Sequence, residues 1–579
     1  MQLTTLDWGI VSLYFALSLC IGLWASKRAG ESTRSFFLAG RNMPWWLLGV
    51  SMVATTFSTD TPNLVTDLVR QNGVSGNWVW WAFLLTGMLT VFLYAKLWHR
   101  SGVLTDIEFY ELRYGGKPAA FLRGFRALYL GLIFNVLVMG AVSLAAVKFG
   151  EIVLGWEGWV TISIACSITL IYSTLGGLRA VIITDFVQFI LAMTGSIWAV
   201  FYLLGLPEIG GLSSLITHEI VINKLAIIPD FSDPDIWIPV LFVPLAVQWW
   251  ASYYPGAEPG GGGYIAQRMF SARDESNAVG AALLFNIAHY ALRPWPWILI
   301  ALASLIVFPT LSDLQATFPH LPEDKLGHDV AYPAMLTLLP PGLLGLVAAS
   351  LIAAFMSTMS TQVNLGASYL VNDFYHRFIN PAASATQLVK IGRLFTALSI
   401  VLGGSLGLIL TSAGQAFTLL LMIGSGTGLI YILRWFWWRI NALTEIVAMV
   451  SSLIIAAVLN FSELGFEDWQ KIVLGAVITT IIWVLTAFIT PAESKETLIK
   501  FVDKVKPGGP GWKQFQSEDE SGMTHITNGI INMILGCLTV YCFLIGVGEM
   551  IYENYQYSII LLLISIFTAF TLKKRMANG

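Results

Sequence analysis

Long apolar stretches alternate with short polar ones along the whole chain. A helix needs about 20 apolar residues to cross a bilayer, and we count fifteen stretches near that length. They are 7–26, 44–69, 77–98, 121–148, 159–175, 180–206, 237–266, 278–308, 341–371, 386–411, 415–437, 442–461, 471–490, 526–548 and 557–572. The pattern predicts an all-α polytopic membrane protein with about 15 transmembrane helices.

Charged residues support this count. Only 12% of the 579 residues are charged and 56% are hydrophobic, whereas soluble domains are about 25% charged. With the N-terminus outside, 26 of the 32 Lys and Arg residues fall in inside loops, 5 fall in outside loops and Arg293 lies within a span. Because positive charge is retained on the cytoplasmic side, this bias predicts an outside N-terminus and an inside C-terminus.

The first stretch and the cysteines add little chemistry. Stretch 7–26 has no basic region before it, so we expect a retained helix rather than a cleaved signal peptide. The cysteines fall in apolar stretches without C-x-x-C spacing, which favours buried apolar roles over disulfides or metal sites. They are Cys20, Cys166, Cys537 and Cys542.

The second apolar stretch loses its apolar character halfway. Residues 45–54 read WWLLGVSMVA, whereas 55–62 read TTFSTDTP. Inside a bilayer, non-helical polar backbone is tolerated only where it lines a cavity, and a carboxylate such as Asp60 at this depth indicates a functional site. We predict a broken helix. The alternative is an ordinary loop, which would leave about ten apolar residues, too few to span ~30 Å.

A second interruption lies in stretch 237–266. Two prolines and five glycines occur within Trp249–Tyr264. This stretch comes five spans after the first interruption, so the two helices run in opposite directions. Interruptions at corresponding places in two halves indicate inverted repeats with a binding site near the membrane midplane. The alternative is a loop at 255–263, with the span ending at Tyr254.

Polar side chains recur inside other spans. Hydroxyl, carbonyl and carboxylate oxygens suit a hard cation such as Na⁺, although single hydroxyls in membrane helices also serve packing. The polar positions are Asp185 and Gln188, His289 and Arg293, Ser357-Thr358 and Ser360-Thr361.

Three other interpretations compete with a sodium-driven transporter. Proton coupling through Asp185, Glu258 or His289 predicts uptake that follows pH. A membrane enzyme is disfavoured, because the sequence has no His/Asp metal cluster and no nucleophile–base spacing. A solute sensor is also disfavoured, since we find no signalling domain after stretch 557–572.

Four stretches resemble the sodium/solute symporter family, which includes sodium/glucose cotransporters and bacterial proline and sialic-acid symporters. The stretches are SFFLAGR at 35–41, FYELRYG at 109–115, GGLRAVIITDFVQ at 176–188, and AFMSTMS at 354–360 with NDFY at 372–375. The resemblance implies a leucine-transporter-type core of five plus five helices in inverted repeats. Fifteen spans is one more than we expect of most members.

The resemblance also implies a sodium site between spans 44–69 and 341–371. Its ligands by position are the carbonyls of Ala54, Phe57 and Ala354 and the hydroxyls of Ser357 and Thr358. Asp185 matches a carboxylate that binds a second sodium in some members and aids coupling in others. We therefore expect one or two Na⁺ ions as the coupling ion.

We expect the substrate near the break in span 44–69. Tryptophan faces suit sugar C–H surfaces or cations, an arginine suits a carboxylate, and carboxylates suit hydroxyls or an amine. These features predict a sodium-coupled symporter for a small polar solute, namely a sugar or polyol, a sugar acid, or an amino acid. The candidate residues are Thr56, Thr59, Asp60, Asn77, Trp78, Trp81, Trp249, Trp250, Tyr253, Glu258, His289 and Arg293, and Tyr254 is a further candidate for an aromatic gate.

We divide the chain into five segments. We predict an extra N-terminal helix and loop in 1–43, a first repeat in 44–206 and an outside loop in 207–236. A second repeat occupies 237–437, and peripheral helices fill 438–579, with an inside loop at 491–524. Short loops favour the bacterial inner membrane, as a multi-pass protein. We expect the solute and the lipid bilayer as partners, with no nucleic acid and no obligate protein partner.

Overall fold

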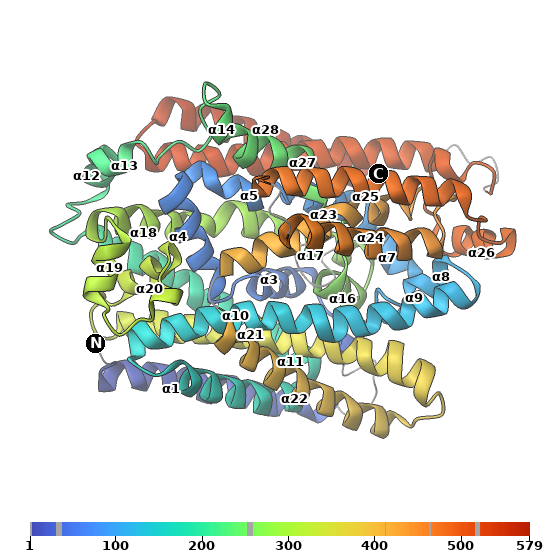
Figure 1. Ribbon diagram of the computed structural model, residues 1–579, viewed down its shortest axis with the longest axis horizontal. Helices are drawn as coiled ribbons and strands as arrows, with labels where there is room; N and C mark the ends of the chain where they lie inside the picture. The colour runs from blue at the N-terminus through green and yellow to red at the C-terminus, as the bar shows by residue number, and fades with distance from the viewer. Residues whose placement is uncertain are drawn as a thin grey trace.

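The protein is helical throughout the residues that the computed structural model describes. These are 3–29, 37–251, 259–410, 413–461, 465–515 and 521–578. Within them no strand forms, and Met43 and Ala272 make an isolated β-bridge. Many of the long helices run along the long axis of the molecule (Figure 1). The all-α prediction is confirmed.

The α-helices have the following bounds. They are α1 Thr5–Ala29, α3 Trp45–Thr55, α4 Asp60–Asn72, α5 Trp78–Trp81, α6 Leu84–Leu89, α7 Ala95–Ser101, α8 Phe109–Arg113, α9 Gly116–Leu128, α10 Asn135–Phe149, α11 Gly158–Leu204, α12 Leu212–Thr217, α13 Glu219–Ile222, α14 Pro234–Trp237, α15 Val243–Ala246, α16 Gly263–Ser271, α17 Glu275–Ile287, α18 Pro294–Val307, α19 Leu311–Thr317, α20 Ala331–Leu336, α21 Leu343–Ser368, α22 Ala385–Ile409, α23 Ala413–Leu433, α24 Ala442–Phe461, α25 Asp468–Ile489, α26 Lys495–Val505, α27 Ser521–Ile551 and α28 Tyr555–Asn578.

Short helical turns of other pitch join many of these helices. The π turns are η3 Thr90–Tyr94, η4 Tyr129–Phe134, η5 Gly150–Leu154, η6 Ile238–Phe242, η8 Ala288–Leu292 and η11 Tyr369–Ile379. The 3₁₀ turns are η1 Ala39–Arg41, η2 Val74–Asn77, η7 Gln248–Trp250, η9 Glu323–Lys325, η10 His328–Val330 and η12 Pro510–Trp512.

Ten helical stretches of the described chain are long and apolar enough to cross a membrane. They are Val74–Ser101, Gly116–Leu154, Leu178–Leu204, Glu275–Val307, Leu343–Ile379, Ala385–Ile409, Ala442–Asn460, Asp468–Ile489, His525–Ile551 and Tyr555–Ala577. Five shorter apolar helices overlap the other five predicted spans, at Thr5–Ile21, Trp45–Thr55, Gly158–Ile171, Pro234–Ala246 and Gly424–Leu433. A multi-pass membrane protein is therefore indicated, and the count of fifteen crossings stays a prediction.

Helix α11 contains two predicted spans and reverses direction between them. Just before its start, Trp156 stacks on Trp8 near the beginning of α1, and Arg179 lies over the ring of Trp24 near the other end of α1. A straight continuation would carry the chain far past α1, because a helix rises 1.5 Å per residue. Instead Gly195 packs against Val347, near the start of α21. That end of α21 contacts Asp7, near the beginning of α1. The two parts of α11 therefore run in opposite directions.

The predicted break in the second apolar stretch is confirmed. Helix α3 ends at Thr55 and α4 begins at Asp60, and the residues between them are not helical. Only 11 residues form α3, which is too short to cross ~30 Å at 1.5 Å per residue. The chain therefore exposes a helix C-terminus and a helix N-terminus to the interior of the protein.

The second interruption is also present. Helix α15 ends at Ala246 and α16 begins at Gly263. Gly260 and Gly261 have positive φ angles of 91° and 83°. A Cβ on Gly260 would lie 2.6 Å from the ring of Tyr94. Only glycine adopts this backbone at no steric cost and allows the close approach, which explains the glycine run at this point.

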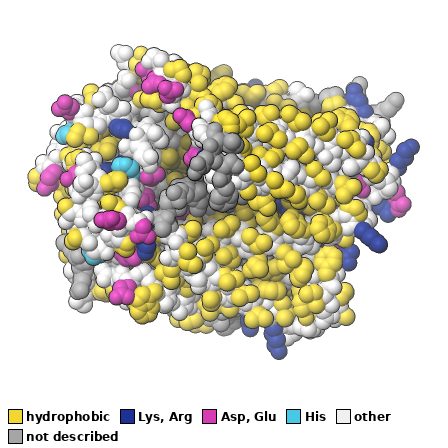
Figure 2. Space-filling view, in the orientation of Figure 1, with side chains coloured by type: hydrophobic (Ala, Val, Ile, Leu, Met, Phe, Trp, Pro, Cys, Tyr) yellow, Lys and Arg dark blue, Asp and Glu magenta, His cyan; other side chains and the backbone are white. Residues whose placement is uncertain are grey.

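The surface has the character expected of a membrane protein. Figure 2 shows hydrophobic side chains over most of one face, with Asp and Glu gathered towards one end and Lys and Arg at the other. Six cations expected in loops are nevertheless buried. Five of them lie within helices, which corrects their assignment to loops, and Arg434 lies in the turn after α23. Each can offset its desolvation with helix-terminal carbonyls, carboxylates or aromatic rings. They are Arg70, Arg113, Arg126, Lys148, Arg268 and Arg434.

The extra N-terminal helix is tied to α21. Asp7 of α1 is buried, and its Oδ1 accepts hydrogen bonds from the backbone N–H groups of Gly342 (2.7 Å) and Gly345 (2.8 Å) at the start of α21. A carboxylate at a helix N-terminus satisfies free N–H groups and interacts favourably with the helix dipole.

We expect Asp7→Ala to lower the free energy of unfolding by about 1–3 kcal/mol, because it leaves two buried N–H groups without an acceptor. Thermal unfolding of the purified protein measures this effect. Asp7→Asn is the matched control, since its amide oxygen keeps an acceptor and should lose less. Equal stability of Asp7→Ala and the unmodified protein would contradict the assignment.

Candidate functional site

The break between α3 and α4 is held by side chains from both sides. The Thr56 N–H donates to the carbonyls of Met52 and Val53 at 3.3 and 3.1 Å, and the Thr61 hydroxyl donates to the Thr56 carbonyl at 3.1 Å. From α21, Thr358 Oγ1 donates to the Thr55 carbonyl at 2.9 Å. A hydroxyl of α21 therefore reaches the last carbonyls of α3.

Asp185 lies at the centre of a buried polar cluster. Ser51 Oγ of α3 donates to its Oδ2 at 2.5 Å, and Ser357 Oγ of α21 donates to its Oδ1 at 2.6 Å. Arg268 of α16 lies with Nη2 3.7 Å from Asp185 Oδ2, and both side chains are fully buried. Four helices that are distant in sequence thus meet at one carboxylate.

Arg268 is anchored by further polar groups. Its Nη2 donates to Thr361 Oγ1 at 2.9 Å, its Nη1 donates to Gln267 Oε1 at 2.9 Å, and its Nε donates to Ser51 Oγ at 3.3 Å. Removing a charge from water costs several kcal/mol unless it is paired and hydrogen-bonded. These contacts supply the pairing, and they connect the helix after the second interruption with the helix before the first.

The structure brings the predicted sodium ligands together. Ala54 and Phe57 lie at the end of α3, Ala354, Ser357 and Thr358 lie on α21, and all five are buried. A hydroxyl that donates its proton still offers oxygen lone pairs, so Ser357 and Thr358 can present oxygens to a cation beside the carbonyls at the end of α3. The Ala54 carbonyl there already accepts a hydrogen bond from the Phe57 N–H at 3.2 Å, and its second lone pair could face a cation. Oxygen donors of this kind suit Na⁺. Their role as ligands stays a prediction.

A second cluster lies beside the same break and contains the predicted residues Thr56, His289 and Arg293. Thr56 Oγ1 lies 3.1 Å from His289 Nδ1 and accepts a hydrogen bond from Arg293 Nη1 at 3.1 Å. The guanidinium also lies over the ring of Trp297, which stacks on Phe57 with ring centroids 5.1 Å apart. The cluster combines a cation, a neutral donor–acceptor pair and aromatic faces.

Trp80 belongs to this cluster, although the sequence analysis did not select it. Its ring packs edge-on against His289 at 5.5 Å and stacks on Tyr290 at 5.9 Å. Asn77 Oδ1 accepts a hydrogen bond from Trp80 Nε1 at 2.9 Å, so Asn77 orients this ring. No local signal in the sequence separates Trp80 from its neighbours Trp78 and Trp81, because only the contacts with His289 and Tyr290 distinguish it.

Trp78 and Trp81 are directed elsewhere. Trp78 Nε1 donates to the carbonyl of Ile227 at 2.9 Å, and its ring contacts Tyr541 of α27. Trp81 is fully buried and packs edge-on against Trp78 and Trp80. The structure therefore does not bring these two predicted residues together with the break.

The remaining predicted residues fall into three groups: residues of the break itself, residues that pack on other helices, and residues outside the described chain. Thr59 Oγ1 donates to the Val142 carbonyl at 3.3 Å, and the half-buried Asp60 is the first residue of α4. Trp249 and Trp250 pack on helices α6 and α23 through hydrogen bonds with Thr86 and Ser425 rather than on the break. Tyr253, Tyr254 and Glu258 lie outside the described residues.

The FYELRYG stretch has a structural role at the Lys/Arg-rich end. Arg113 is buried and donates to the carbonyls of Arg434, Trp437, Trp438 and Ile440, just after the last turn of α23. Free carbonyls at a helix C-terminus attract a cation. This stretch therefore fastens the chain before α9 to the end of α23.

Glu111 of the same stretch belongs to a charge network. It pairs with Arg123 at 2.6 Å and Arg377 at 3.0 Å, and Arg123 also pairs with Asp373 at 2.7 Å. Partial burial acts to raise the pKa of Glu111, but the hydrogen bonds from Arg377 and Arg123 outweigh it and hold that pKa below its ordinary value. Glu111 therefore stays charged at neutral pH, and the network links α8, α9 and the end of the α21 span.

Gln362 is a buried amide one turn beyond Thr358 on α21. It is fully buried, and within the described chain neither its Nε2 nor its Oε1 has a hydrogen-bond partner. Buried polar groups without partners are rare and costly. Residues four apart share a helix face, so this amide lies in line with the predicted sodium ligand.

We expect Gln362→Met to raise the free energy of unfolding by about 1–3 kcal/mol, because a similarly shaped apolar side chain removes the unpaired polar atoms. Thermal unfolding checks the stability, and a transport assay should show slower uptake if the amide contacts the passing ion. Ser350→Ala serves as a control on the same helix, since that hydroxyl bonds to its own helix at Val347. A stability loss in Gln362→Met would contradict the prediction.

No group of three or more His, Cys, Asp or Glu side chains within the described residues could hold a metal ion. The polar chemistry of the interior in these parts of the chain consists of hydroxyls, carbonyls, amides and a few paired charges. This composition suits an alkali cation better than a transition metal, which prefers imidazole or thiolate ligands.

Comparison with known proteins gives a consistent result. A family model described as the sodium:solute symporter family matches residues 36–454. A sodium/glucose cotransporter of Vibrio parahaemolyticus is 26% identical over 510 residues, which cover 84% of this chain and 91% of that protein. A sodium/mannose cotransporter of Bos taurus is 28% identical over 482 residues, which cover 76% of each chain.

A solved structure has a similar fold. It is the substrate-bound outward-open state of a Na⁺-coupled sialic acid symporter, and it superposes with a TM-score of 0.67. The two chains are 21% identical, and the match covers 85% of this chain and 99% of the other. At this identity the likeness establishes the shared fold.

Proposed function

The chain belongs to the sodium:solute symporter family, and on this premise we propose that it imports a small polar organic solute by alternating access. It is a multi-pass membrane transporter, and Na⁺ is its coupling ion. The solute class that we propose is a sugar or polyol, a sugar acid, or an amino acid. The observation that carries the proposal is the contact of Thr358 with the Thr55 carbonyl at the break of α3.

We place two inverted repeats at 44–206 and 237–437, with the remaining helices peripheral. Support comes from the two interruptions, since α3–α4 and α15–α16 fall at corresponding places of the two halves. Such interruptions provide free carbonyls for a cation and free N–H groups for an anion near the midplane. The bacterial inner membrane, an outside N-terminus and an inside C-terminus are part of the same proposal.

Sodium would bind between α3 and α21, with Ala54, Phe57, Ala354, Ser357 and Thr358 as ligands. An inward step of one Na⁺ through ~100 mV contributes about 2.3 kcal/mol, and a tenfold gradient adds about 1.4 kcal/mol. One ion could then support roughly 500-fold accumulation of a neutral solute.

Asp185 serves coupling in this proposal rather than a second sodium. Arg268 lies 3.7 Å from its carboxylate, so a second cation at that position would meet a like charge. Ser357 donates to Asp185 and is also a proposed sodium ligand. When sodium binds or leaves, the hydrogen bond from the Ser357 hydroxyl to Asp185 changes. This alters the contact between Asp185 and Arg268, and Arg268 belongs to α16.

The substrate would lie on the other side of the break. Arg293, His289, Thr56 and Trp80 surround this position with one cation, neutral donors and an aromatic face. An arginine recognises a carboxylate through two parallel hydrogen bonds, and aromatic faces suit the C–H surface of a sugar ring. This combination favours a hydroxylated solute with an acidic group over a simple sugar.

A thermal-stability screen tests the proposal. Sugars, polyols, sugar acids and amino acids would be added to purified protein in Na⁺ and in equal K⁺. A ligand at one hundred times its Kd should add about 2.7 kcal/mol of stability. A solute that stabilises only in Na⁺ supports the proposal. A solute effect that ignores Na⁺ and follows pH would refute it in favour of proton coupling through Asp185 or His289.

A further inference from the structure

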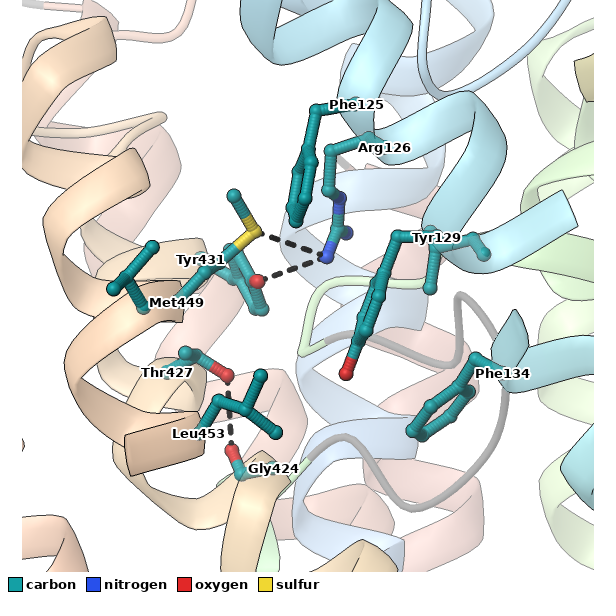
Figure 3. A pocket seen from close by; sticks show the side chains of 11 residues that line it. Phe125, Arg126, Tyr129, Phe134, Gly424, Thr427, Tyr431, Met449 and Leu453 are labelled. Carbon is teal, nitrogen blue, oxygen red and sulfur yellow. Dashed lines mark hydrogen bonds between the residues drawn. The ribbon is translucent and has the colours of Figure 1, made fainter. Parts of the chain in front are cut away.

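A groove lies between helices that take no part in the site described above. It runs between α9 with η4 on one side and α23 with α24 on the other (Figure 3). Its lining residues are Phe125, Arg126, Tyr129, Leu130, Phe134, Gly424, Thr427, Tyr431, Met449, Val450 and Leu453.

The groove opens sideways onto the apolar surface. Phe125, Val450 and Leu453 stand at its mouth and are 37%, 46% and 46% exposed. Neighbouring residues on the same stretch, Phe121 and Ile133, are 60% and 57% exposed. In a multi-pass membrane protein, apolar side chains exposed in this way face the hydrocarbon of the bilayer. A molecule that enters the groove therefore comes from the lipid.

A buried cation forms part of this apolar groove. Arg126 is 4% exposed; one of its terminal nitrogens donates to the Tyr431 hydroxyl at 3.0 Å and lies 3.6 Å from Met449 Sδ. In Figure 3 the guanidinium lies beside Phe125 and Tyr431, and the Tyr129 hydroxyl points away from it, towards the part of the groove that holds Phe134. The groove therefore offers a charged donor and two phenol hydroxyls beside its apolar walls.

Arg126 belongs to a cluster of cations and aromatic rings. Arg126 and Arg434 both lie over the rings of Tyr110 and Tyr431. Glu445 pairs with Arg434 at 3.5 Å and also accepts a hydrogen bond from Tyr114. Arg126 itself lines the groove, and its positive charge favours an anionic group on the ligand.

The depth of Arg126 suits a lipid headgroup. Arg123, one turn earlier on α9, belongs to the charge network with Glu111 and Asp373 at the Lys/Arg-rich end. Three residues of helix rise about 4.5 Å, so Arg126 lies just inside that charged layer. Basic pockets between membrane helices at this level bind anionic lipid headgroups.

We propose that this groove binds an anionic phospholipid. Its phosphate contacts Arg126, and one acyl chain lies along Phe134 and Leu453. The lipid would bridge α9 with α23 and α24, which connects a helix of the first repeat with the end of the second. The proposal needs only a membrane location and does not depend on which solute is transported.

Native mass spectrometry of the protein, exchanged into an equal mixture of phosphatidylglycerol and phosphatidylcholine, tests the proposal. We expect about tenfold enrichment of bound phosphatidylglycerol, a fold-change that corresponds to about 1.4 kcal/mol. Arg126→Gln should abolish the enrichment and Arg126→Lys should retain most of it. Val450→Trp should block the mouth, whereas Val477→Trp, at a residue 49% exposed on α25, is the matched control.

Three outcomes would overturn the proposal. Equal retention of the two lipids by the unmodified protein would exclude a preference for anionic lipid. Unchanged enrichment in both Arg126→Gln and Val450→Trp would place the lipid elsewhere on the surface. Thermal stabilisation by inorganic phosphate equal to that by phosphatidylglycerol would show that the site binds a free anion and not a lipid.

Discussion

Replacing Arg268 with glutamine should lower the free energy of unfolding by about 3–5 kcal/mol, because the substitution leaves Asp185 as an unpaired buried charge. The double variant Arg268→Gln with Asp185→Asn should recover most of that loss, since two neutral amides replace the ion pair. Denaturation of Arg268→Gln, Asp185→Asn and the double variant in the same detergent measures the interaction as a double-mutant cycle.

Arg268→Lys is the control for charge alone. Lysine keeps the positive charge but has no planar fork to reach Thr361, Gln267 and Ser51 together. We expect stability between that of the unmodified protein and that of Arg268→Gln. A change below about 1 kcal/mol in Arg268→Gln, within the range of an exposed pair, would show that the pair is not the buried contact described here.

Thr358→Val should raise the Na⁺ concentration for half-maximal uptake by about 10–100-fold or more, the range found when groups that only support metal ligands are removed. Valine keeps the shape of threonine, so the hydroxyl oxygen is the main loss. If that hydroxyl serves only its bond to the Thr55 carbonyl, the variant should lose about 1 kcal/mol of stability and keep its sodium dependence.

Ser350→Ala is the matched control for Thr358→Val. Ser350 is also a buried hydroxyl on α21, but it donates to the Val347 carbonyl of its own helix. Its removal should leave the sodium dependence unchanged. Sodium titration of uptake in liposomes at fixed pH separates the two variants, and an equal effect of both would remove Thr358 from the sodium site.

Local features of the sequence predicted much of the fold. Apolar stretches marked the helices, and the polar TTFSTDTP segment and the glycine run marked the two interruptions, because a bilayer tolerates free backbone only inside the protein. Loop charge was less dependable. It counted Arg113, Arg268 and Arg434 as loop residues, although each is buried by contacts with distant helices.

Some of the site residues could be selected from the sequence, and others could not. Asp185 could be selected from residue type and depth alone, whereas Ser357 and Thr358 were selected as sodium ligands through the family resemblance. Trp80 could not be separated from Trp78 and Trp81, since only its contacts with His289 and Tyr290 distinguish it. Arg268 lies just after the second interruption, and nothing in its neighbourhood in the sequence indicates that it meets Asp185.

The sequence by itself determined where helices begin, where two of them break, and which oxygen-bearing side chains lie at membrane depth. These properties depend on residues within a few turns of each other, so periodicity and composition record them. The tertiary structure alone decided which side chains of distant helices meet, including the Asp185–Arg268 pair and the groove at Arg126. Such contacts depend on how four or more helices pack together, and no local pattern encodes that packing.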